Sequence, residues 1–214
     1  MQSDGVTGPD RGDAPAMVAC GTAPLVEALE ACWEEARGRG LGWRRRLPAR
    51  RDIDPALLGE ALPRALILER TSGANARIRV AGQSLCRWAG YELRGNPVLS
   101  LFEGRSREAL APVIAAVFSE PARLDMDLGS DAGGAGRLTL LPLLGRDGLP
   151  SMAMGVITGP LAGARARLSL ADGKAPCLTP VALRGWARPV ASAAVPPPPP
   201  RTDQPVLRLV VDNG

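Results

Sequence analysis

The sequence predicts one domain of the α+β class, because strand-like segments occur in two groups with helical segments between them. Two short strand-like segments form the first group: Ala65–Glu69, and Arg77–Val80, which alternates polar and apolar residues with period two. Three more, Arg123–Leu128, Arg137–Leu144 and Met152–Thr158, form the second group, and glycine-containing turns separate them. A chain of 214 residues is long enough to bury one such core without metal or disulfide staples.

Ahead of the strands, residues 1–21 are rich in glycine, aspartate and proline, so we expect them to be disordered. Residues 22–42 predict an amphipathic flanking helix outside the main domain. An apolar stripe must be buried, so its apolar face either covers the domain's own sheet or forms the seam of a homodimer. We expect a homodimer that also uses an outer face of the sheet. The interface residues on the helix are then Leu25, Leu29, Cys32 and Trp33.

An arginine-rich segment follows, with seven arginines between Arg37 and Arg51 and Trp43 among them. It is either a solvated connection held by nearby carboxylates such as Asp52 and Asp54, or a phosphate-binding segment with an indole for stacking. We favour the solvated connection because no recognised nucleic-acid motif accompanies the charge. Asp54 also predicts a helix start, since its carboxylate can accept from first-turn amides and the next residue is proline.

The stretch from Ala76 to Phe102 contains a strand, a turn, a short helix and a loop. Leu85 and Trp88 lie at helical spacing, and Gly90 is placed to end that helix. Beyond this stretch, a stripe of apolar residues up to Phe118 predicts a longer helix beside the sheet.

The order R-x-R-V-A-G-x-x-L-x-x-x-x-G-x-E-L-x-G, which begins at Arg77, resembles the PAS sensory domain, in a divergent bacterial group whose members often consist of little more than that domain. A segment from Trp43 to Glu69 resembles that group's entry into the first strand, and the whole resemblance runs to Gly159. It implies a five-stranded antiparallel sheet in the order 2-1-5-4-3 with helices on one face. It also implies a domain over residues 43–160, in addition to the N-terminal flanking helix.

Beyond this domain, residues 161–190 predict an extension in which Ala166–Leu170 could add a strand. Residues 191–214 contain five consecutive prolines, which predict an extended linker, followed by a short strand-like tail.

The net charge of +4 does not by itself indicate a nucleic-acid partner, because Lys174 is the only lysine among 26 basic residues and the arginine excess is typical of a GC-rich genome. Four widely spaced cysteines give neither a zinc ribbon nor a disulfide framework. The chain shows no signal peptide and no run of about 18 apolar residues that could span a membrane. We therefore expect a cytoplasmic protein.

Histidine is absent, which removes the usual general base, the Ser-His-Asp triad and imidazole ligation of haem. Asp125 and Asp127 alternate with leucine and methionine, so we interpret them as the solvated face of a strand rather than a metal or acid–base pair. Cys86 lies where the resemblance implies a cavity-facing helix, yet the cysteine motif of flavin photoreceptors is missing. The sequence thus favours no cofactor, no metal and no enzymatic activity.

The function that we predict is a non-enzymatic PAS-type sensor or adaptor that binds a signalling protein, with an arginine-rich nucleic-acid-associated protein as the alternative. A small apolar ligand could modulate it from a cavity in the domain, although the same residues also describe a filled core. The expected cavity residues are Leu85, Cys86, Trp88, Tyr91, Phe102, Leu141, Leu143, Met152 and Met154.

Overall fold

The structure is a computed structural model that describes residues 23–39, 47–71, 75–130, 134–159, 167–171 and 174–181. The predictions for the N-terminal segment, Trp43, the proline-rich linker and the final strand-like tail lie outside these residues. No helix in the described ranges is long and apolar enough to cross a membrane.

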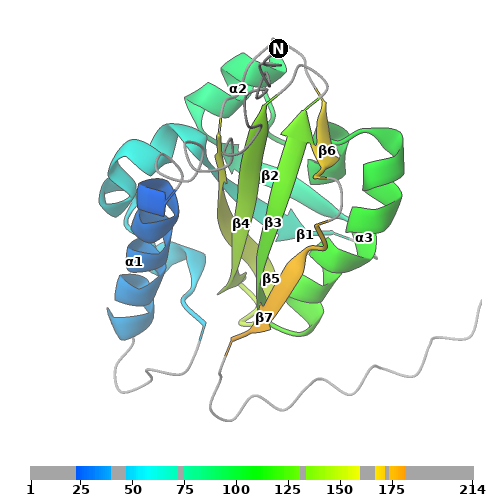
Figure 1. The fold of residues 1–214 in the computed structure, drawn as a ribbon. Coiled ribbons are helices and arrows are strands. Elements are labelled where there is room, and N and C mark those ends of the chain that lie inside the picture. Colours follow the sequence, from blue (N-terminus) through cyan, green and yellow to red (C-terminus); the bar gives the residue numbers. More distant parts are fainter. Residues whose placement is uncertain are drawn as a thin grey trace, which may run out of the picture. The chain divides into compact units, whose positions relative to one another are not determined.

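One antiparallel sheet forms the centre of the described fold (Figure 1). Its strands follow the order β2-β1-β5-β4-β3-β6, and β7 pairs with β3 beside β6. This confirms the predicted order 2-1-5-4-3. The strands are β1 (Ala65–Arg70), β2 (Ala76–Ala81), β3 (Ala122–Ser130), β4 (Ala135–Leu144), β5 (Pro150–Thr158), β6 (Leu168–Leu170) and β7 (Cys177–Pro180).

Strands β6 and β7 cover consecutive parts of one edge of the sheet. Leu168–Leu170 pairs with the end of β3, and Cys177–Pro180 pairs with its beginning. The first of these strands falls within the predicted Ala166–Leu170, whereas the second was not predicted. Both protect the polar backbone of β3, which would otherwise be an open edge.

Two of the described helical segments have an end that one residue explains. The Asp54 carboxylate accepts a hydrogen bond from the amide of Ala56 at 3.0 Å, as predicted for a helix start. Gly90 ends α2 in the left-handed region at φ 77°, a conformation that glycine adopts at little cost. The segments are α1 (Ala23–Arg39), the 3-10 helices η1 (Arg50–Asp52) and η2 (Pro55–Arg64), α2 (Gln83–Ala89), the 3-10 helix η3 (Val98–Leu101) and α3 (Gly104–Ser119).

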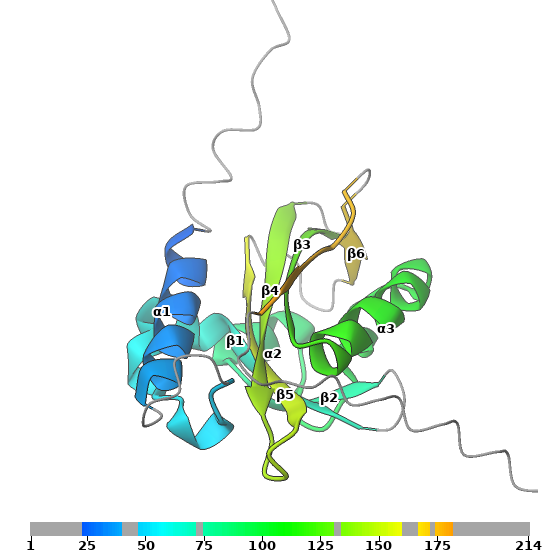
Figure 2. The same cartoon turned by 90° about the horizontal axis from the view of Figure 1, so that it is seen from below.

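Helices cover both faces of the sheet rather than one, as two views at right angles show (Figure 1, Figure 2). On the inner face, α2, η3 and α3 pack against side chains such as Leu66, Ile78 and Leu124. On the outer face, α1 and η2 pack against a second cluster that contains Leu143 and Val156. We call these the inner cluster and the outer cluster.

The apolar face of α1 belongs to the outer cluster and is buried within the chain. Leu29 and Cys32 are completely buried, and Trp33 is 3% exposed. The indole Nε1 of Trp33 donates a hydrogen bond to the carbonyl of Pro142 in β4 at 2.9 Å. Leu25 is half-buried against the same cluster. Of the two predicted alternatives, this helix therefore covers the domain's own sheet, and the four residues are not free to form a dimer seam.

The packing also extends the compact fold beyond the predicted limits of residues 43–160. Helix α1 shares one hydrophobic cluster with η2, β4 and β5, and β6 and β7 are part of the sheet. The sequence left this packing open, because an amphipathic pattern shows that a face is buried without showing against which surface.

Candidate functional site

The nine side chains predicted to line one cavity do not lie together. Leu85, Trp88 and Phe102 are buried in the inner cluster, and Cys86 is partly buried against it. The Cys86 Sγ lies 3.7 Å from the Glu92 carboxylate. Tyr91 is 48% exposed, so it lines neither cluster. The inner residues form a packed core in this structure.

The four remaining residues of that prediction, Leu141, Leu143, Met152 and Met154, lie in the outer cluster, on the opposite face of the sheet. Side chains alternate between faces along a strand, and in β4 it is Leu138 and Leu140 that face inward. The sequence could not show this because both faces of β4 are buried, which leaves a continuous apolar run instead of an alternating one.

An apolar hollow of about 390 Å³ lies beside the outer cluster, between η2, the strands β1 and β2, and the start of α2. Two of its lining side chains are exposed although they are aliphatic: Leu62 is 45% exposed and Val80 is 42% exposed. Its apolar lining includes Ile53, Leu58, Leu62, Ile67, Val80 and Met154. Pockets of this size and character commonly take an apolar group of a ligand or of a partner.

A second, larger hollow of about 870 Å³ adjoins the first, and the two share Arg50 and Val80. We call it the arginine hollow, because five arginines of the described part of the chain line it, together with the carboxylates Glu69 and Asp147. These arginines come from four parts of the chain: η1, β2, the loop after α2 and the turn between β4 and β5. They are Arg50, Arg51, Arg79, Arg94 and Arg146.

The arginines of this hollow differ in their internal partners. Arg79 is ion-paired with Glu69, and Arg51 lies 3.7 Å from the Asp52 carboxylate. The side chains of Arg50, Arg94 and Arg146 form no hydrogen bond or ion pair with any other residue that the structure describes. In the described part of the arginine-rich segment, Arg51 thus lies near the carboxylate of Asp52, as predicted, whereas Arg50 has no carboxylate partner among the described residues.

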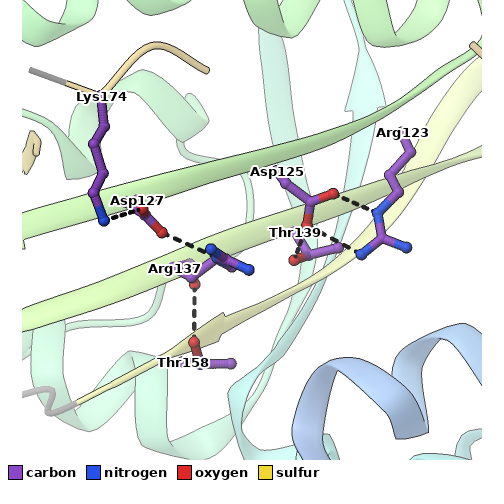
Figure 3. Close-up of polar contacts among 7 residues, drawn as sticks. All are labelled: Arg123, Asp125, Asp127, Arg137, Thr139, Thr158 and Lys174. Atoms are coloured by element: carbon purple, nitrogen blue, oxygen red, sulfur yellow. Dashed lines mark hydrogen bonds and ion pairs between the residues drawn. The ribbon is translucent and has the colours of Figure 1, made fainter. Parts of the chain in front are cut away.

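The face of β3 that we predicted to be solvated is instead a half-buried, ion-paired network, on the same side of the sheet as the outer cluster (Figure 3). Arg123 bonds the Asp125 carboxylate and is also ion-paired with Glu30 of α1. The Asp125 Oδ1 accepts a further hydrogen bond from Thr139 at 2.8 Å. Asp125 thus belongs to a paired, partly buried network that ties β3 and β4 to α1.

Asp127 occupies a second part of this network (Figure 3). Its carboxylate accepts from Lys174 at 2.8 Å and from Arg137 at 3.0 Å. The hydrogen bond from Lys174, with the contribution of Arg137, lowers the pKa of Asp127 below its ordinary value. A carboxylate held in its charged form by two cations is poorly suited to accept and release protons near neutral pH.

The described residues contain no group of three or more His, Cys, Asp or Glu side chains that could hold a metal ion. In its described part, the fold offers a sheet with two adjoining hollows, one apolar and one basic. The family model for the PAS domain matches residues 22–158, which is more than half of the chain, so the chain belongs to the PAS domain family. The match includes α1, in agreement with the packing of that helix on the sheet. A comparison with curated proteins finds no match.

Neither hollow was predicted from the sequence. The sign of the arginine hollow in the sequence is the run of arginines that ends at Arg51, and this run contributes two of the five arginines. The other three are isolated in the sequence and meet only in the folded chain.

Proposed function

We propose that this PAS domain is a non-enzymatic sensor or adaptor that acts by binding a protein partner. The observation that carries the proposal is the apolar hollow, with Leu62 and Val80 exposed on its rim. Aliphatic side chains gain free energy when a partner removes them from water, at roughly 25 cal/mol per Å² of apolar surface. A small apolar ligand in the same hollow would compete with the partner and so modulate the binding.

The absence of enzymatic activity is part of this proposal and has support from the chemistry of the chain. The sequence contains no histidine. Burial raises the pKa of the Cys32 thiol, with a further contribution from nearby Asp54, so this sulfur stays protonated and unreactive near neutral pH. Asp125 and Asp127 are held in ion pairs, as described above.

The arginine hollow is the specific observation in favour of the alternative, an association with nucleic acid. However, none of the lining residues that the structure describes is aromatic. Proteins that bind single-stranded nucleic acid gain much of their affinity by stacking bases on aromatic rings. Aliphatic residues beside arginines fit a protein partner better, so we retain nucleic acid only as the competing outcome of the experiments.

Homodimerisation and a cytoplasmic location remain part of the proposal. The buried face of α1 cannot supply the dimer interface without leaving the outer cluster, so we expect a different surface to form it. Size-exclusion chromatography with light scattering measures the dimer directly.

The test of partner binding compares two leucines of the same helical segment. Leu62 lines the apolar hollow and is 45% exposed, whereas Leu57 is 43% exposed and does not line it. Full-length protein and the variants Leu62→Glu and Leu57→Glu are each used to recover proteins from an extract of the organism that produces the chain. We expect Leu62→Glu to lose specific partners that Leu57→Glu retains, with both variants folded by circular dichroism. Equal recovery by the two variants would show that the apolar hollow is not the docking site.

A further inference from the structure

We propose that the arginine hollow recognises the side-chain carboxylates of a partner protein, so that the docking motif is an aliphatic residue with aspartate or glutamate residues beside it in the partner's sequence. The aliphatic side chain fills the apolar hollow and the acidic residues lie among the arginines. This inference rests on the proposed function and names the chemistry of its partner.

The arginine hollow contains positively charged side chains that have no partner among the described residues. Among the described residues, the guanidinium groups of Arg50, Arg94 and Arg146 have no carboxylate or carbonyl partner, and all three residues are exposed. A guanidinium group presents a planar fork of donors that matches a carboxylate in a bidentate pair. The three are therefore available to bind an anion from outside the chain.

The two carboxylates of the hollow are already engaged by other residues of the chain. Glu69 is ion-paired with Arg79. The Asp147 Oδ1 accepts from the amide of Leu149 at 3.1 Å and from the Ser151 hydroxyl at 3.3 Å, so it is held within its own hairpin. Neither carboxylate forms an ion pair with the three unpaired arginines, and the hollow keeps an excess of positive charge.

The three unpaired arginines come from segments that are far apart in the sequence and meet at the arginine hollow. Arg50 comes from η1, Arg94 from the loop after α2 and Arg146 from the turn between β4 and β5. Like charges held near one another repel, so this arrangement is unfavourable in the free chain. An acidic segment in the hollow would remove the repulsion, and several arginines acting together give an affinity that one exposed pair, worth about 0–1 kcal/mol, does not.

The two hollows are contiguous, since Arg50 and Val80 line both. One extended ligand can therefore occupy both, with its apolar and acidic parts side by side. A peptide segment meets this requirement because it can place an aliphatic side chain next to carboxylates. A nucleic acid supplies the charge, but its bases find no aromatic side chain among the lining residues of the described ranges.

The experiment selects binding peptides without assuming their sequence. A phage library of random 12-residue peptides is selected on the full chain, and the enriched peptides are synthesised with a fluorescent label for anisotropy measurements. We expect the enriched sequences to carry an excess of Asp and Glu near Leu, Ile, Val or Met. Their affinity should fall as salt is raised, because ions screen exposed charges.

Two double variants with the same change in net charge test whether the selected peptides bind in the arginine hollow. Arg94→Gln with Arg146→Gln removes two arginines of the hollow, whereas Arg87→Gln with Arg105→Gln removes two exposed arginines outside it. We expect the first pair to weaken peptide binding about tenfold and the second to change it less than about twofold. Enriched peptides without acidic residues, or equal losses in the two double variants, would overturn the inference.

A single-stranded RNA of 20 nucleotides is measured against the same variants. If it binds more tightly than the selected peptides and loses affinity only in the Arg94 and Arg146 variant, the hollow is a nucleic-acid site and the inference is wrong. Failure of the inference and failure of the proposed function are distinguishable through Leu62→Glu. If partner recovery depends on Leu62 but not on Arg94 and Arg146, the proposed adaptor function is supported and only the inferred acidic motif is wrong.

Discussion

Replacing Leu29 with alanine tests whether α1 is part of the core. Leu29 is completely buried in the outer cluster. Truncation removes three carbons, which at about 0.8 kcal/mol for each buried CH₂ amounts to about 2.4 kcal/mol of transfer free energy. The cavity left behind adds to this, and such changes cost about 2–5 kcal/mol in total. We expect the free energy of unfolding to fall by about 3 kcal/mol.

The measurement is equilibrium unfolding in urea, followed by tryptophan fluorescence and by circular dichroism. The melting temperature should also fall, by about 6–12 °C for a chain of this size. Glu27→Ala is the matched control, because Glu27 is an exposed residue of the same helix. We expect that control to change the free energy of unfolding by less than about 0.5 kcal/mol.

A different result would refute the assignment of this helix face to the core. If the face formed a dimer seam instead, Leu29→Ala would convert a dimer to a monomer and leave the monomer folded and stable. Light scattering at several protein concentrations separates the two outcomes. A stable monomeric variant that has lost less than about 1 kcal/mol would contradict the packing argument.

The remaining predictions concern a close backbone approach and an ion-paired carboxylate. A Cβ atom at Gly82 would lie 2.3 Å from the carbonyl carbon of Pro63, so Gly82→Ala should destabilise the fold by about 1–3 kcal/mol. Gly104→Ala, where no atom lies within 4 Å of the added carbon, should be neutral or slightly stabilising, and equal losses in urea unfolding would contradict this account. The lowered pKa of Asp127 means that its contribution to stability is present above the ordinary aspartate pKa of about 3.9 and is lost as pH falls through the folded-state value. Asp127→Asn should therefore reduce the loss of stability between neutral and acidic pH, and an unchanged pH profile would refute the role of its ion pairs.

Much of the fold could be predicted from local patterns, because their causes are local. The alternation of Leu124, Met126 and Leu128 with polar residues identified both the strand and its buried side. The cap at Asp54 and the helix end at Gly90 depend on one residue and its immediate neighbours. The order of the strands followed from the family resemblance.

The candidate site could not be predicted in the same way. In β4 both faces are buried, so the sequence alone gave no means to decide that Leu138 faces inward and Leu141 outward. The surface that α1 covers was equally open, because an apolar stripe fits the chain's own sheet as well as a second copy.

What the sequence by itself determined is the class of the fold, the positions of most helices and strands, and the absence of histidine chemistry, since each depends on composition or on residues near one another in the chain. The tertiary structure alone decided which faces meet and which charges gather. Arg50, Arg94 and Arg146 are far apart in sequence, and only the packing of η1, the loop after α2 and the β4–β5 turn brings them to one hollow. A ligand site built from such distant residues depends on long-range contacts, and local sequence patterns do not contain that information.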